Sequence, residues 1–503
     1  MTSGAQLEAV RVRISEVVGS VDDRVSGKLS EWLSAWTPTT FRALELDVAE
    51  VFRDLGDEVM EVLLQSIVED EAFYVTARKA ARKGLAPLRN GGARSTQVTL
   101  LGGRQVSVRA DYLRKDLSKR PGPKRGHGRR GKAGSGVYPA LAALGIEFGV
   151  TPALAAEATR QVTDSNSLRA GQSALMRRGI DLEYKQLLRV VNAVGQRSVE
   201  QRDAWLADAL EQPAKRGPLK GRRVVVAIDG GRLRERVERP GRRRAETGHH
   251  GFDAPWREPK VFTIYTVDAQ GRASKSFRPV YDGTLDGADA AFAMMTAYLK
   301  ALGAHEAKSL IVLGDGAKWI WERTAQLVEI LGLPEDRVRE IVDWFHATEH
   351  LSEVAKAPAK WDDGARNRWL KKAKDILHTG DIDALMGHFD TLAIGRRATA
   401  VNEHRAYFRN NATRMQYREL KAAKQPLGSG AVESAIRMIV NLRLKSAGKY
   451  WLRENAQSML LLRSYLKSGR FDDLFDWSAS QPVSWWAPAH EAAPQAPIAE
   501  ASA

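Results

Sequence analysis

The chain contains no cysteine in its 503 residues. Disulfide scaffolds, zinc sites built from thiolates and cysteine nucleophiles are therefore excluded, and a reducing compartment fits. Long hydrophobic runs are also missing, because no window reaches the roughly 18 uncharged apolar residues that a membrane span requires. The first residues of the chain mix charged with apolar side chains and do not resemble a secretory signal. We expect a cytoplasmic protein with no membrane partner.

Acidic residues are outnumbered by basic ones. Lys and Arg total 77 against 61 Asp and Glu, a net charge of +16 with a pI near 9.8. This excess suits a polyanionic partner, since binding to phosphates releases counterions, although merely soluble proteins can be equally basic. The hydrophobic fraction of 43% is ample for folding, and the length predicts several domains.

Residues 1–112 are predicted to form a helical domain with a small hairpin. Apolar residues recur at helical spacing from about Thr39 to Lys83, which predicts an amphipathic helix. From 97 to 109, β-branched residues alternate around Gly102-Gly103, the pattern of two short strands joined by a tight turn.

A basic linker is predicted at 113–136, because Pro and Gly among many charges cannot build a core. We expect it to lie along DNA phosphates, and a solvated connector is the alternative. Its central cations are Lys124, Arg125, Arg129 and Arg130. Short helices with tight turns then predict a helix-turn-helix-like DNA-binding domain at 137–219, a pattern that any small helical domain shares.

The stretch 220–346 differs in kind, because it alternates strands with helices. The predicted order is βββαβαβ, with strands at 224–229, 261–267, 275–281, 310–314 and 338–344 and helices at 286–302 and 318–330. Three strands that pair antiparallel, followed by two that are joined through helices, specify a mixed five-stranded sheet covered by helices. This is the strand order of a ribonuclease-H-like fold.

The remainder of the chain is predicted to be helical. An all-α insertion at 347–424 interrupts the sheet domain, which resumes at 425–476 with a helix that begins at Gly430. The Ala- and Pro-rich end belongs to a disordered tail at 477–503.

Three carboxylates lie where a predicted strand ends or a predicted helix begins. Asp229 and Asp315 each close an apolar strand, and these strands should be neighbours, so their side chains can converge. Glu433 lies in the first turn of a late helix, where a negative charge suits the helix dipole. Three acids on rigid elements can gather two divalent ions for phosphodiester chemistry, and oxygen ligands select Mg²⁺ or Mn²⁺. The alternative is that each acid only ends its strand or begins its helix.

The half from Arg222 to Leu466 resembles the DDE transposases of bacterial insertion sequences, particularly the ISKra-type group and more distantly the Mutator-like group. The resemblance rests on the first Asp after a strand, on Asp343-Trp344-Phe345-His346, and on two longer stretches. These are Gly314-Asp315-Gly316-Ala317-Lys318-Trp319-Ile320-Trp321 and Gly428-Ser429-Gly430-Ala431-Val432-Glu433-Ser434. The N-terminal half matches only in layout, because the cysteine pairs of some relatives are absent.

The resemblance implies an enzyme that cuts DNA at element ends and transfers the freed 3′-hydroxyls into target DNA. By it, Asp229, Asp315 and Glu433 would be catalytic and metal-binding, with His346 and Asp343 in support. The implied partners are double-stranded DNA, as terminal inverted repeats and target, and further copies of the chain in a multimer. Association with the nucleoid follows from that role.

Further cations near the acids are candidates for phosphate contacts, with a solvated face as the alternative. Arg232 and Arg234 follow the first acid, and Arg443 and Lys445 follow the third.

Three other functions remain open. A ribonuclease-H-like nuclease or resolvase would use the same acids without strand transfer. A domesticated DNA-binding protein would bind no metal at all. A zinc peptidase is suggested by His346-Ala347-Thr348-Glu349-His350, in which two histidines one helical turn apart would bind zinc and Glu349 would act as base.

Overall fold

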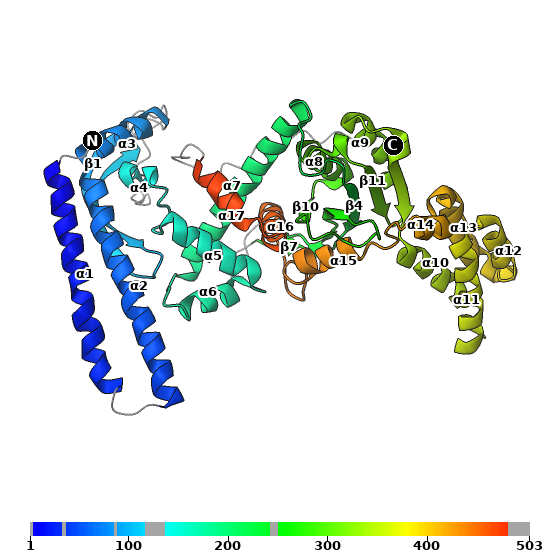
Figure 1. Cartoon of the computed structure of the whole chain (residues 1–503), viewed down its shortest axis with the longest axis horizontal. Helices are drawn as coiled ribbons and strands as arrows, with labels where there is room; N and C mark the ends of the chain where they lie inside the picture. The colour runs from blue at the N-terminus through cyan, green and yellow to red at the C-terminus, as the bar shows by residue number, and fades with distance from the viewer. Residues whose placement is uncertain (1–3, 33–36, 85–87, 116–135, 242–249, 481–503) are drawn as a thin grey trace. The chain divides into compact units, whose positions relative to one another are not determined.

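The structure is a computed structural model that describes residues 4–32, 37–84, 88–115, 136–241 and 250–480 (Figure 1). The predicted linker cations Lys124, Arg125, Arg129 and Arg130, and most of the predicted tail, lie outside these described residues. Two compact units divide the chain: one runs up to Val162 and includes Leu168–Val191, and the other comprises Thr163–Ser167 and Asn192–Ser478. No helix in the described ranges is long and apolar enough to cross a membrane.

The first unit is mainly helical, with one hairpin. Its elements are α1 (Gly4–Trp32), α2 (Pro38–Glu69), α3 (Glu71–Gly84), β1 (Leu88–Thr99), β2 (Gln105–Lys115), β3 (Gly136–Val137), α4 (Pro139–Ala143), α5 (Pro152–Asp164), α6 (Leu168–Met176) and the start of α7 (Tyr184–Glu211). The helix predicted from Thr39 to Lys83 is in fact two helices. Asp70 breaks it, because its backbone is extended and its carboxylate accepts a hydrogen bond from the Phe73 amide, 2.7 Å away, to begin α3.

The predicted hairpin is present and longer than expected, and a buried acid holds its turn. Asp57 of α2 is 4% exposed and accepts hydrogen bonds from the amides of Gly102 (3.0 Å) and Arg104 (2.9 Å). These bonds satisfy backbone groups that the turn leaves unpaired, so α2 and the hairpin form one body.

The second unit is built on a mixed sheet. Its strands are β4 (Arg223–Gly230), β5 (Leu233–Arg234), β6 (Val237–Glu238), β7 (Phe252–Asp253), β8 (Trp256–Arg257), β9 (Lys260–Val267), β10 (Val280–Thr284), β11 (Ser309–Gly314) and β12 (Val338–Val342). The order β10-β9-β4-β11-β12 makes the five-stranded sheet, antiparallel from β10 to β4 and parallel from β4 to β12. The predicted mixed five-stranded sheet is confirmed, and the fold is compatible with a ribonuclease-H-like one.

The second unit also contains helices. They are α8 (Gly287–Ala301), α9 (Lys318–Leu331), α10 (Trp344–Lys356), α11 (Asp363–Thr379), α12 (Ile382–Asp390), α13 (Ala398–Asn410), α14 (Tyr417–Ala422), α15 (Gly430–Ile436), a π-helix η6 (Arg437–Asn441), α16 (Arg453–Lys467) and α17 (Phe471–Ser480). Helix α8 packs on β9 and β10, and α15 packs on β4 and β9. Helices α10–α14, drawn from yellow-green to orange in Figure 1, occupy the stretch where an all-α insertion is predicted.

Two strand predictions need correction. The third strand begins at Val280 rather than Lys275, because Ser274 and Ser276 hydrogen-bond each other in a turn and Pro279 has no amide proton to pair. The fifth strand ends at Val342 rather than Trp344. Asp343 is the N-cap of α10, and its carboxylate accepts a hydrogen bond from the His346 amide at 2.8 Å.

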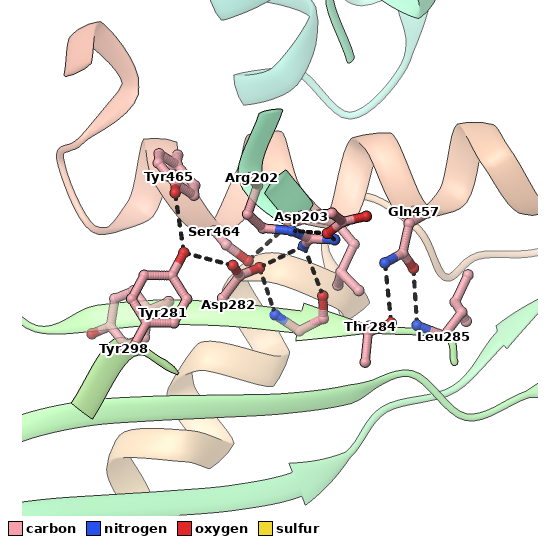
Figure 2. A network of polar contacts seen from close by, with 12 residues as sticks. Arg202, Asp203, Tyr281, Asp282, Thr284, Leu285, Tyr298, Gln457, Ser464 and Tyr465 are labelled. Atoms are coloured by element: carbon pink, nitrogen blue, oxygen red, sulfur yellow. Dashed lines mark hydrogen bonds and ion pairs between the residues drawn. The ribbon is translucent and has the colours of Figure 1, made fainter. Parts of the chain in front are cut away.

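A buried polar network joins α7, β10, α8 and α16 (Figure 2). Asp282 is fully buried and accepts hydrogen bonds from the Arg202 guanidinium (3.1 Å), the Gly283 amide (2.8 Å) and the Tyr298 hydroxyl (2.8 Å). Tyr298 and Tyr465 share a further bond of 3.0 Å. Each member compensates the desolvation of another, so removing one leaves a buried charge or dipole unpaired.

Candidate active site

Asp229 and Asp315 stand at the same edge of the sheet. β4 and β11 are parallel neighbours, with Ala227 paired to Leu313, so the chain reaches Asp229 and Asp315 two residues further along each strand. Adjacent strands lie roughly 4.8 Å apart. Both side chains are half-buried, and the charge of Asp315 acts on Asp229. The structure thus brings the first two predicted acids together.

The environment of Asp229 resists ionisation. Burial, reinforced by the Asp315 carboxylate, raises the pKa of Asp229 from 3.8 to about 6, although the Gly230 amide and the charges of His346 and Lys260 act in the opposite direction. Two carboxylates side by side in a partly dry site repel each other. A divalent cation would relieve this repulsion, so the pair fits Mg²⁺ or Mn²⁺, which prefer oxygen ligands.

Glycines flank both acids for steric reasons. A Cβ on Gly230 would lie 1.9 Å from Oε1 of Glu258. Gly316 has φ +95°, and a Cβ there would lie 2.6 Å from the Tyr407 ring. At Gly314 a Cβ would lie 2.7 Å from Cδ1 of Ile320, so both glycines of the Gly-Asp-Gly motif stand where a side chain would clash.

Asp343 links the same sheet edge to the segment that bears Glu433. This acid is 1% exposed, and its backbone amide donates to the Gly314 carbonyl at 2.8 Å. Its carboxylate accepts hydrogen bonds from the amides of both His346 and Ser429. The Ser429 hydroxyl in turn donates to Glu433 at 2.9 Å. Asp343 therefore connects three backbone segments at this edge of the sheet.

The third acid lies in this neighbourhood, but its carboxylate is not grouped with the other two. Glu433 is exposed, in the first turn of α15, which packs on β4 and β9. Across the described residues, no three His, Asp or Glu side chains are gathered closely enough to hold one metal ion. The structure thus brings Asp229 and Asp315 together, whereas the Glu433 carboxylate lies apart from them and accepts a hydrogen bond from Ser429.

The histidines of the possible zinc motif engage aromatic neighbours. His350 stacks on Tyr407 with ring centroids 3.8 Å apart, and its Nδ1 lies 2.8 Å from Nδ1 of His404. Burial, together with His346 and His404, lowers the pKa of His350 to about 4. Nδ1 of His346 lies 3.5 Å from Glu349. The ring of His350 is thus committed to packing and to a hydrogen bond.

The predicted DNA-contacting cations have different surroundings. Arg232 and Lys445 are exposed. Arg234 is half-buried, with its guanidinium 4.8 Å from the centre of the Trp256 ring. Arg443 is only 5% exposed; it donates to the Asn166 carbonyl and lies over Trp451, so its guanidinium faces protein.

The segment that follows the first acid contains two short antiparallel strand pairs, which form a β-ribbon. Its paired strands are β5 with β8 and β6 with β7. On it, Arg234 stacks on Trp256 and Arg236 stacks on Phe252, at 4.8 and 4.6 Å. Trp256 is 51% exposed, so cations and open aromatic surface alternate next to Asp229. Two-residue strands carry no alternation signal, which is why the sequence pattern missed this ribbon.

Lys260 is a second feature that sequence reasoning missed. It pairs with Gly230 across the antiparallel β4–β9 ladder, and its ammonium lies 4.3 Å from the centre of the Trp319 ring and 2.7 Å from Glu258. Burial raises the pKa of Asp229 and the charge of Lys260 opposes that rise in part, which places a cation near this acid. Only strand pairing reveals this neighbour, because a lone lysine at a strand start is an ordinary residue in a sequence.

Comparisons with known proteins add little. No family model matches the chain, and no curated protein matches it. Among solved structures, a chain of the Drosophila P element transposase strand transfer complex matches with 13% identity and a TM-score of 0.22, covering 65% of this chain and 80% of that one. A TM-score this low supports no inference about fold or function.

Proposed function

We propose that this protein is a DDE transposase that cuts the ends of an insertion sequence and joins them to target DNA. The observation that carries the proposal is that Asp229, at the end of β4, and Asp315, just after the parallel strand β11, lie near each other, with Glu433 on a helix that packs on β4. The sheet order and the motifs that resemble ISKra-type transposases support it.

In the proposed reaction, the three acids bind metal ions and neighbouring residues support them. Asp229, Asp315 and Glu433 would hold two Mg²⁺ or Mn²⁺ ions. When bound, such ions activate water or a 3′-hydroxyl and stabilise the leaving oxygen. Asp343 keeps the Ser429 segment against the sheet edge, and Lys260 brings positive charge to Asp229.

The proposed reaction has two steps, and neither needs a reactant other than water and DNA. In the first step, water attacks phosphorus and the bond to the 3′ oxygen breaks, which leaves a 3′-hydroxyl. In the second step, that hydroxyl attacks a target phosphate and displaces the target's own 3′ oxygen, which takes up a proton.

Double-stranded DNA is the proposed partner, both as terminal repeats and as target. The exposed Arg232 and the Arg–aromatic ribbon adjoin the acid pair, so they suit phosphates and bases near the cut. The helical stretch 137–219 and the linker cations would bind the element ends. A multimer on DNA and work at the nucleoid belong to the same proposal.

Replacing single acids tests the proposal. Asp229→Ala or Glu433→Ala should lower Mg²⁺-dependent cleavage of a terminal-repeat duplex by about 10³-fold or more, with binding to that duplex retained. Asp289→Ala, which removes an exposed acid on α8 of the same unit, is the matched control. Undiminished cutting by either active-site variant would overturn the assignment.

A donor-plus-target assay separates the transposase from a nuclease or resolvase. A transposase yields donor ends joined to target DNA, whereas the nuclease alternative yields cleavage products alone. Cleavage without joined products, under conditions where both DNAs are bound, would replace the proposal by that alternative.

A further inference from the structure

The loop that carries Asp315 is fastened by a helix of the insertion. Tyr407 of α13 donates its hydroxyl proton to the Asp315 carbonyl at 2.9 Å. Asn411, at the end of the same helix, donates to the Gly316 carbonyl at 3.1 Å. The carbonyl groups of two consecutive residues, Asp315 and Gly316, thus both accept hydrogen bonds from side chains at the C-terminal end of α13.

These bonds constrain an otherwise permissive loop. Gly316 adopts φ +95°, a conformation that glycine reaches without steric strain. The backbone of the loop therefore does not by itself fix the direction of the Asp315 side chain. Within the loop, the Asp315 carboxylate accepts a hydrogen bond from the Ala317 amide at 2.8 Å. Its orientation therefore depends on where the backbone of Asp315 to Ala317 lies, and Tyr407 and Asn411 set that position.

Both side chains are themselves held by further contacts. Asn411 is 2% exposed, accepts a hydrogen bond from the Trp321 indole at 2.9 Å and donates a second one to the Tyr407 carbonyl. Tyr407 stacks on His350.

We propose that Tyr407 and Asn411 are positioning residues that orient Asp315 for metal binding, so that the helical insertion is part of the active site. The inference rests on the proposed metal-binding role of Asp315. Residues that hydrogen-bond to a metal-binding residue and so orient it typically contribute 10–100-fold to metal affinity. We expect a loss of affinity of that size when Tyr407 or Asn411 is replaced.

Tyr417 provides a matched control. It is also a buried tyrosine of the insertion, and its hydroxyl donates at 3.1 Å to the Val342 carbonyl, at the end of the neighbouring strand β12. Tyr407→Phe and Tyr417→Phe therefore each delete one hydroxyl and one hydrogen bond to a strand-end carbonyl. The two changes differ in whether that carbonyl belongs to Asp315.

Calorimetric titration of the full-length protein with Mn²⁺ is the test. We expect Tyr407→Phe to weaken Mn²⁺ binding about tenfold or more and Tyr417→Phe to change it less than about twofold, although both lower the melting temperature similarly. Raising Mn²⁺ should restore cleavage in Tyr407→Phe, which a merely structural defect would not allow. Asn411→Ala, which releases Gly316, should give the same ranking by a second route.

Equal Mn²⁺ affinity in Tyr407→Phe and Tyr417→Phe would overturn the inference. Asp315→Asn distinguishes this failure from failure of the proposed function. If Asp315→Asn loses Mn²⁺ binding and Tyr407→Phe does not, only the positioning role fails. If Asp315→Asn binds Mn²⁺ like the unaltered protein, the metal site itself is wrong.

Discussion

Replacing Asp229 by Asn should make the metal-free protein more stable at neutral pH while it abolishes activity. The pKa of Asp229 is about 6 in the fold against an ordinary 3.8, so folding disfavours its ionised form. That difference corresponds to about 3 kcal/mol at 1.36 kcal/mol per pKa unit. Because solvent reaches part of the side chain, we expect a gain of roughly 2 kcal/mol. Asn keeps the oxygen that accepts the Gly230 amide, at 2.6 Å, and carries no charge.

The sign follows from proton linkage. Below pH 3.8 Asp229 is protonated in both folded and unfolded chains, and its burial has no ionisation penalty. As pH rises from 3.8 to about 6, the unfolded chain ionises first, so the folded state loses stability. The advantage of the Asn variant should therefore be complete above about pH 6 and shrink steadily toward pH 4.

Urea unfolding followed by tryptophan fluorescence, in EDTA at several pH values, measures this difference. Added Mg²⁺ should then reverse the ranking, because it binds and stabilises only the protein with Asp229. At 100 times its dissociation constant the ion would contribute about 2.7 kcal/mol. An Asn variant less stable than the unaltered protein in EDTA at pH 7.5, or a difference that does not change with pH, would refute the reasoning.

Three further changes have clear expected outcomes. Gly316→Ala should cost about 1–3 kcal/mol and cleavage activity, whereas Gly332→Ala, also at positive φ but in open space, should lose stability alone; equal activity in both would contradict this. Asp282→Asn leaves Arg202 buried without its main partner and should cost about 3–5 kcal/mol in urea unfolding, and a loss under 1 kcal/mol would contradict it. The lowered pKa of His350, about 4, means that stability falls by roughly 2 kcal/mol as pH drops from 6.5 to 4; in His350→Asn the loss should be smaller, and an unchanged pH profile would refute it.

The central sheet could be predicted because its strands are short apolar runs buried on both faces. In β4 and β11 this burial demands continuous Val, Ile and Leu, which makes both strands and the acids that end them visible in the sequence. Asp343 was misassigned to a strand end because an N-cap and a strand terminator look alike until the next turn is seen.

The contacts that complete the site could not be predicted from spacing. Tyr407 and Asp315 are 92 positions apart, and the tyrosine bonds to a backbone carbonyl. Every residue has such a carbonyl, so the amino-acid types in the sequence do not indicate this contact. Lys260 reaches Asp229 only through strand pairing. The side-chain direction of Glu433 depends on the Ser429 hydroxyl, a local choice that competes with any contact across the sheet edge.

The insertion begins and ends at one point of the sheet. Trp344, the first residue of α10, donates its amide proton to Leu427 at 2.8 Å, and Asp343 binds Ser429. The chain thus leaves the sheet and returns to it at the same place, and the two ends of the insertion are hydrogen-bonded to each other. Lengthening or trimming the outer helices would leave the strand ends undisturbed, provided that the turn of α13 nearest the acids keeps its place.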